Sequence, residues 1–143
     1  MNQYSITLLV FAISSSCAFA QDVPDVIPAD TAIGAIVSDT VKAAFDEIDQ
    51  EAEKYYNRGI SKFQKGALQA ALEDFNEAIQ KKPEFEKALY NRGSVKYELG
   101  YFNGAIADFN MAIKLNPNST NSYFSKGRAN YVLGKKQDAL IDY

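Results

Sequence analysis

A stretch of 34 residues is repeated along this chain, and this repeat constrains the fold more than any other feature of the sequence. The segment 52–85 is repeated at 86–119, and a third copy starts at residue 120. The first two copies are identical at 13 of 34 positions. So many identities at one fixed spacing do not arise by chance, so the chain contains a tandem repeat. In such arrays each unit hides its apolar face only by stacking on its neighbours.

Glycine, alanine, phenylalanine and proline recur at fixed positions of each copy. The recurring columns are Gly59/Gly93/Gly127, Gly66/Gly100/Gly134, Ala71/Ala105/Ala139, Phe75/Phe109/Tyr143, Ala78/Ala112 and Pro83/Pro117. The first glycine is predicted to face the first alanine, so that two helices approach closely despite a helix-propensity cost of about 1 kcal/mol. The second glycine suits the left-handed position that ends a helix, and the proline ends the next one.

These columns resemble the tetratricopeptide repeat family, whose unit is a helix–turn–helix of 34 residues. The family's large residue near the start of the first helix is matched by Tyr55, Leu89 and Tyr123. The resemblance implies an all-α, right-handed solenoid over residues 52–143, with units at 52–85 and 86–119 and a truncated unit at 120–143. The expected helices lie near 52–65, 68–81, 86–99, 102–115, 120–133 and from 136 onward.

The first 20 residues are predicted to be a signal peptide. Residues 6–13 form an apolar run too short to span a bilayer, and Ala18-Phe19-Ala20 has the small residues of a signal-peptidase site. Cleavage after Ala20 would place the protein in the periplasm or outside the cell, without stable membrane insertion. Acylation of Cys17 as a lipoprotein is disfavoured, because Ser14 stands where a leucine-like residue is needed. A buried apolar N-terminal helix is the alternative, since no Lys or Arg precedes the run.

Residues 21–35 are predicted to be an extended linker, because two prolines and three aspartates fall within 21–30. Residues 36–51 then show helical spacing of apolar side chains. This segment is predicted to be a lone lead-in helix that caps the open apolar face of the first repeat. The alternative is an amphipathic helix that joins the linker to the repeats without packing on them.

Composition argues against catalysis, cofactors and metals. The chain has no histidine, and its only cysteine is Cys17, so the mature protein could build neither a His-activated nucleophile nor an imidazole or thiolate metal site. A net charge of −3 without a basic stretch also argues against binding nucleic acid. The carboxylates of Asp74, Asp108 and Asp142 recur with the repeat, which favours a structural role over an active site.

Arginines recur opposite those aspartates. Arg58, Arg92 and Lys126 stand where the family usually has leucine, and the Asp column lies on the second helix of the same unit. One hypothesis is that Arg58–Asp74 and Arg92–Asp108 form ion pairs through the forked guanidinium donors. The alternative is that the arginines belong to an ordinary solvated face.

In this family the first helices of successive units line a concave groove. Transferred to this sequence, the groove residues are Tyr56, Asn57, Ile60, Lys87, Tyr90, Asn91, Ser94, Asn121, Phe124 and Arg128. Two aromatic columns run along it, Tyr56/Tyr90/Phe124 and Phe63/Tyr97/Tyr131. Aromatic side chains and carboxamides suit an extended peptide or a partner's helix. Aromatic residues at this spacing also suit the core between repeats, and the sequence leaves both roles open.

Family members that clamp acidic chaperone tails use basic residues on the groove helices. Only Asn91 matches a clamp position here, because Tyr56, Asn121 and Ser125 occupy the basic ones. The sequence therefore predicts a non-catalytic module that binds a peptide or protein, with no chaperone-tail clamp. Alternatives are a homo-oligomerisation unit, or the repeat part of a longer enzyme or secretion component. Since residue 143 falls inside a helix of the third unit, the end face is expected to meet further chain or another molecule.

Overall fold

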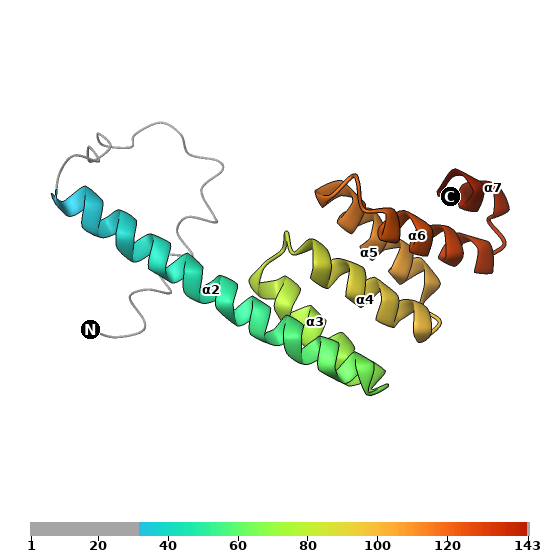
Figure 1. The fold of residues 1–143 in the computed structure, drawn as a ribbon, viewed down its shortest axis with the longest axis horizontal. Coiled ribbons are helices and arrows are strands. Elements are labelled where there is room, and N and C mark those ends of the chain that lie inside the picture. Colours follow the sequence, from blue (N-terminus) through green and yellow to red (C-terminus); the bar gives the residue numbers. More distant parts are fainter. Residues whose placement is uncertain (1–31, 143) are drawn as a thin grey trace, which may run out of the picture. The chain divides into compact units, whose positions relative to one another are not determined.

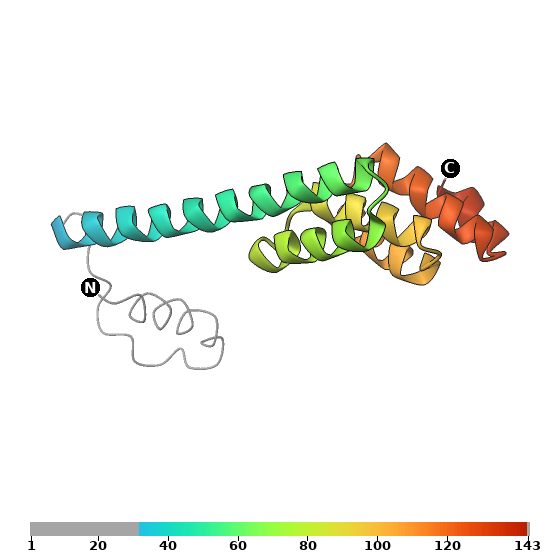
Figure 2. The same cartoon turned by 90° about the horizontal axis from the view of Figure 1, so that it is seen from below.

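The computed structural model describes residues 32–142, and within this range the secondary structure is entirely helical. The helices are α2 (Ala32–Gln64), α3 (Leu68–Lys81), α4 (Glu86–Glu98), α5 (Phe102–Leu115), α6 (Thr120–Val132) and α7 (Lys136–Asp142). The predicted all-α class is confirmed, and from α3 onward the helices follow the predicted bounds to within one residue. Each of α3 to α6 packs against the next helix along the chain, as Figures 1 and 2 show.

The predicted boundary near residue 52 is wrong, because α2 is one unbroken helix from Ala32 to Gln64 (Figure 2). The expected lead-in helix and the first helix of the first repeat are therefore one element, and the last part of the expected linker, 32–35, is helical. Phe45, in the segment assigned to a cap, has 60% of its surface exposed. Asp49 and Glu51 of the same segment pair with Lys82 and Lys81 at the end of α3, and the capping role of the segment stays a prediction. The predicted signal peptide and linker residues 21–31 lie outside the described residues.

The turn inside each unit is made by a glycine in the left-handed region. The φ angles of Gly66, Gly100 and Gly134 are 75°, 80° and 76°. At the first of these turns the Gly66 amide donates to the Phe63 carbonyl at 2.9 Å and the Ala67 amide donates to the Lys62 carbonyl at 2.9 Å. This pair of bonds is the Schellman motif, which satisfies the last carbonyls of a helix. The predicted role of the second glycine column is confirmed.

The core lies between the helices of a unit and between successive units. Ala71 and Phe75 of α3 are fully buried together with Val95 of α4, and Ala52 of α2 is buried with Ala78, Phe85 and Ala88 in a second cluster. Small residues at these positions let large neighbours fill the space between helix axes. Because the second cluster joins α2, α3 and α4, it fixes how the second unit stacks on the first.

The first glycine column has a different partner from the one predicted. A Cβ atom placed on Gly59 would lie 2.8 Å from Phe75, and one placed on Gly93 would lie 2.7 Å from Phe109. In both cases the three nearest atoms belong to the phenylalanine ring and not to the alanine of the third column. The glycine therefore accommodates an aromatic ring from the second helix of its own unit.

Candidate functional site

The ten predicted groove residues all reach the surface of α2, α4 and α6, the first helices of the three units. Tyr56, Ile60, Tyr90, Asn91 and Ser94 are half-buried, and Asn57, Lys87, Asn121, Phe124 and Arg128 are exposed. Helix α4 also contacts α6 directly, so these two first helices are neighbours. The residues are therefore placed where a partner could reach them, which leaves their binding role a prediction.

The tyrosines of the first aromatic column serve the core and the surface at once. The Tyr56 ring lies 4.9 Å from the ring of Phe85 and 6.0 Å from that of Phe75, centre to centre. Tyr90 repeats the second contact with Phe109 at 5.9 Å. The last member, Phe124, keeps 53% of its surface exposed. The core role of the two tyrosines is therefore confirmed, and their role in contacting a ligand stays a prediction.

The side chains of the second aromatic column become more exposed toward its last member, Tyr131. Phe63 packs against the buried cluster of the first unit, and Tyr97 meets Phe102 edge-on at 5.3 Å. Tyr131 is 62% exposed. The guanidinium of Arg128 lies over the Tyr97 ring at 4.8 Å, a cation–π geometry that holds it between α4 and α6.

Asn91 is oriented by two hydrogen bonds. Its Nδ2 donates to the Tyr56 hydroxyl at 3.2 Å and to the Lys87 carbonyl at 2.8 Å. Both amide hydrogens are thereby used, and no hydrogen bond to Oδ1 is found among residues 32–142. Burial, with the nearby Glu53 carboxylate, raises the pKa of Tyr56 against the opposing bond from Asn91, so its hydroxyl stays protonated at neutral pH. The pair therefore offers one acceptor and one donor, which is what a peptide backbone requires.

The predicted ion pairs are confirmed, and they lie inside each hairpin. Arg58 donates through Nε to Asp74 at 2.9 Å, and Arg92 donates to Asp108 through Nε at 2.8 Å and Nη2 at 2.7 Å. Both aspartates have 2% of their surface exposed. The third unit keeps the contact as Lys126–Asp142 at 2.6 Å.

Each buried carboxylate has a second donor that the sequence reading missed. Lys62 lies 2.7 Å from Asp74, and Lys96 lies 2.8 Å from Asp108. In the third unit the donor is Asn130, at 2.9 Å from Asp142. These donors stand four residues after the first cation, on the same face of the helix, and that spacing is the signal that could have revealed them. The carboxylates are fully occupied, so they position the groove helices and are not available to a ligand.

We expect the protein to lose stability in acid partly through Asp74. Burial alone would raise the pKa of this carboxyl, but the hydrogen bonds from Arg58 and Lys62 outweigh burial and lower it. Since an unfolded aspartate titrates near about 3.9, the stabilisation is complete above that value and is lost as the pH falls through the folded pKa. The free energy of unfolding, measured with urea from about pH 7 to about pH 2, should therefore fall less steeply with pH in Asp74→Asn than in the parent. The exposed Asp138→Asn is the control, and an Asp74→Asn profile parallel to the parent would contradict the expectation.

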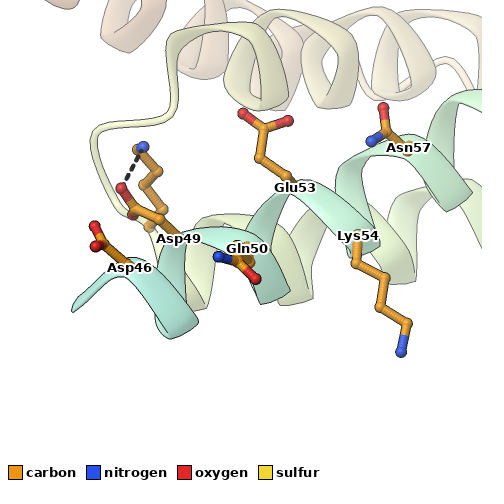
Figure 3. A pocket seen from close by; sticks show the side chains of 7 residues that line it. Asp46, Asp49, Gln50, Glu53, Lys54 and Asn57 are labelled. Carbon is orange, nitrogen blue, oxygen red and sulfur yellow. Dashed lines mark hydrogen bonds and ion pairs between the residues drawn. The ribbon is translucent and has the colours of Figure 1, made fainter. Parts of the chain in front are cut away.

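A polar hollow that the sequence did not predict lies beside the groove residues of α2 (Figure 3). Its volume is about 600 Å³, and its lining residues are Asp46, Asp49, Gln50, Glu53, Lys54, Asn57 and Lys82. Asp49 is paired with Lys82 at 3.0 Å, and Lys54 points away from Glu53 and Asn57 in the close view. The hollow shares Asn57 with the predicted groove, and its lining holds three carboxylates and two lysines.

Within residues 32–142 no group of three or more acidic, His or Cys side chains is arranged to hold a metal ion. The same range contains no helix that is both long and apolar enough to cross a bilayer.

Comparison with known proteins identifies the repeat. A family model described as TPR repeat matches residues 59–100 and 93–134. No curated protein sequence matches.

Solved structures with the same fold include peptide complexes. The second TPR of Spaghetti (RPAP3) bound to the HSP90 peptide SRMEEVD has a TM-score of 0.67 at 24% identity, over 70% of this chain and 92% of that one. The TPR2B domain of yeast Sti1, in a complex with pHsp70, has a TM-score of 0.63 at 30% identity, over 65% of this chain and 74% of that one. MamA has a TM-score of 0.64 at 28% identity, over 66% of this chain and 55% of that one.

Proposed function

The chain belongs to the tetratricopeptide repeat family, and from this we propose that it is a non-catalytic interaction module that binds an extended peptide of a protein partner. The ligand would lie along the groove residues of α2, α4 and α6. Two similar structures, those of Spaghetti and Sti1, were determined in complexes with an HSP90 peptide and with pHsp70. These complexes support peptide binding as a use of the fold, and the chemistry of the ligand must come from this chain's own residues.

The observation that carries the proposal is the orientation of Asn91. Its two donors are held by Tyr56 and by the Lys87 carbonyl, so the Asn91 Oδ1 acceptor and the Tyr56 hydroxyl hydrogen remain for a ligand. A fixed acceptor and donor on neighbouring helices can bond the N–H and C=O of an extended backbone without first paying rotamer entropy. Exposed Phe124 and the tyrosine rings beside this pair would supply apolar contact area.

An acidic chaperone tail is not the proposed ligand. The positions where clamp-type relatives carry lysine or arginine hold Tyr56, Asn121 and Ser125. The hollow beside α2 adds carboxylates to this surface, and they would repel an acidic peptide. A ligand with a neutral or basic segment over α2 fits the charges better.

We also propose that the module works outside the cytoplasm. The apolar run at 6–13 and the Ala18-Phe19-Ala20 sequence support export, with cleavage after Ala20. N-terminal sequencing of the protein recovered from its native cells would give Gln21 as the first residue if this is correct. Recovery of protein that retains residues 1–20 would overturn it.

The test of the groove is selection from a displayed library of short random peptides, followed by measurement of the dissociation constant of an enriched peptide by fluorescence anisotropy. We expect saturable binding, and we expect Asn91→Ala to raise the dissociation constant about tenfold, since it removes an oriented hydrogen-bonding group. Asn110→Ala is the matched control, because Asn110 is an exposed asparagine on α5.

The proposal fails if no peptide binds saturably, or if enriched peptides bind Asn91→Ala as tightly as the parent. Thermal unfolding of each variant should be recorded beside the binding curves. Equal melting temperatures for Asn91→Ala and Asn110→Ala would assign any loss of affinity to the groove and not to the fold.

A further inference from the structure

The surface of α6 and α7 carries a concentration of exposed apolar side chains. Val132 is 48% exposed, Leu140 74% and Ile141 83%. Ile141 also lines a hollow of about 460 Å³, together with Pro117, Asn118, Thr120, Tyr123, Phe124 and Asp142. Apolar side chains gathered around a hollow are typical of surfaces that bind another protein segment. We call this surface the end face.

The chain itself shows what an end face of this kind packs against. A shift of two repeats places Thr120, Tyr123 and Phe124 in the columns of Ala52, Tyr55 and Tyr56. In the first unit those three residues lie in the cluster that is completed by Phe85, the N-cap residue of α4, and by Ala88 of α4. The occupant of the equivalent surface is thus a helix with a large apolar residue followed, three positions later, by alanine.

Among the other segments of residues 32–142 with that pattern, one in α2 includes a largely exposed aromatic side chain. In α2, Val41, Ala44 and Phe45 have the same spacing as Phe85, Ala88 and Leu89 of α4, with alanine at the second position in both. Phe45 is 60% exposed, and Ala44 and Ile48 are half-buried. The segment 41–48, which we call the lead-in face, therefore repeats the apolar pattern at the start of a repeat's first helix, with Phe45 largely exposed.

The charges of the two surfaces are complementary. Residues 39–49 contain four carboxylates and one lysine, whereas residues 133–138, which lead into α7, contain two lysines and one aspartate. One of those carboxylates, Asp49, already pairs with Lys82. The remaining acidic side chains would be attracted to Lys135 and Lys136 at the start of α7, which speeds association and fixes its orientation.

We propose that the lead-in face of one molecule docks on the end face of a second copy of this chain, with Phe45 entering the hollow beside Phe124 and Ile141. The two surfaces belong to the first and the last helices of the described chain, so the contact is heterologous. Heterologous contacts produce rings where the rotation closes and open chains where it does not. The hollow shares Phe124 with the proposed peptide groove, but the association involves neither Asn91 nor Tyr56 and does not depend on the proposed peptide binding.

The experiment is sedimentation velocity on the purified protein over a concentration series, from about 10 µM to about 1 mM because a contact of this size is expected to be weak. The parent should show species larger than a monomer that grow with concentration and recede at high salt. Phe45→Glu and Ile141→Glu should each weaken association by at least about tenfold, since each introduces a charge into an apolar contact. Both side chains are exposed, so neither change disturbs the core.

Mixing the two variants gives the decisive result. Phe45→Glu retains an intact end face and Ile141→Glu retains an intact lead-in face, so the mixture should form a one-to-one dimer that grows no further. Met111→Glu, at an exposed apolar residue of α5, is the control and should associate as the parent does. A parent that stays monomeric throughout, association that survives either variant, or a mixture that does not form the dimer would each overturn the proposal.

Discussion

Replacing Gly93 with alanine is expected to lower the free energy of unfolding by about 1–3 kcal/mol, as overpacking of a tight core does. The added methyl group would lie 2.7 Å from Cε1 and 2.9 Å from Cδ1 of the Phe109 ring. Phe109 is 1% exposed and has buried neighbours, so the ring cannot move without displacing them. This strain exceeds the gain of about 1 kcal/mol that alanine brings to a helix interior. Urea unfolding followed by circular dichroism measures the difference.

Gly104→Ala is the matched control for this experiment. Gly104 also lies in a helix, α5, but a methyl group there would meet only the flexible Lys96 side chain, at 3.4 Å. The helix-propensity gain should therefore appear undiminished, and the variant should be more stable than the parent by up to about 1 kcal/mol. If Gly93→Ala and Gly104→Ala change stability in the same direction, the close approach of Phe109 does not govern the glycine column.

A second substitution tests whether the ring is the cause. Phe109→Leu on its own should destabilise the protein, because it leaves unfilled space in the core. The double variant Gly93→Ala/Phe109→Leu should lose less free energy of unfolding than the sum of the two single variants, because the added methyl group then occupies part of that space. Additive effects would place the strain of Gly93→Ala elsewhere.

The helices from Leu68 onward could be predicted because their signals are local. The turn glycines such as Gly100 and the prolines such as Pro83 act within a few residues of their own positions, and the 34-residue period repeats the signal. The partner of Gly93 could not be predicted in the same way. Whether glycine faces Ala105 or Phe109 depends on the rotation and separation of two helices, and repeat spacing gives neither.

The missing break before the first repeat has a similar explanation. Residues 44–55 contain no glycine or proline, and nothing local ends a helix there. The repeat period alone placed a boundary at 52, but the period states where units begin and not whether a preceding helix stops. The aromatic columns show the other limit, because Tyr97 and Tyr131 occupy the same repeat position while only the second is largely exposed. That difference depends on which neighbours each helix has.

The buried carboxylates give the second large effect, and Asp108→Ala is expected to lower the free energy of unfolding by about 2–3 kcal/mol. Breaking a buried ion pair usually costs about 3–5 kcal/mol. The expected value is smaller here because Arg92 and Lys96, with 17% and 22% of their side chains exposed, can turn partly toward water. Chemical denaturation at neutral pH measures it.

An exposed ion pair shows what burial contributes. Lys81 and Glu51 form a shorter contact, 2.6 Å, but their side chains are 36% and 52% exposed. Solvent screens such a pair, so Glu51→Gln should leave the unfolding midpoint within experimental error. Equal losses from Asp108→Ala and Glu51→Gln would show that burial of the carboxylate is not what makes the first pair matter.

Arg92 should couple to Asp108 and also to the preceding unit. Besides its two bonds to Asp108, it donates from Nη1 to Asn76 of α3 at 2.9 Å, so one side chain ties both helices of its hairpin to the repeat before it. Arg92→Ala should therefore lower the free energy of unfolding at least as much as Asp108→Ala does. It leaves the buried carboxylate with Lys96 alone, and it also breaks the hydrogen bond to Asn76. A double-mutant cycle of Arg92→Ala with Asp108→Ala should give a coupling energy of about 1–3 kcal/mol, and a cycle of Arg92→Ala with Asn76→Ala a smaller one. Zero coupling in the first cycle would mean that the interaction between Arg92 and Asp108 does not stabilise the hairpin. The recurrence of aspartate at this repeat position would then need another explanation.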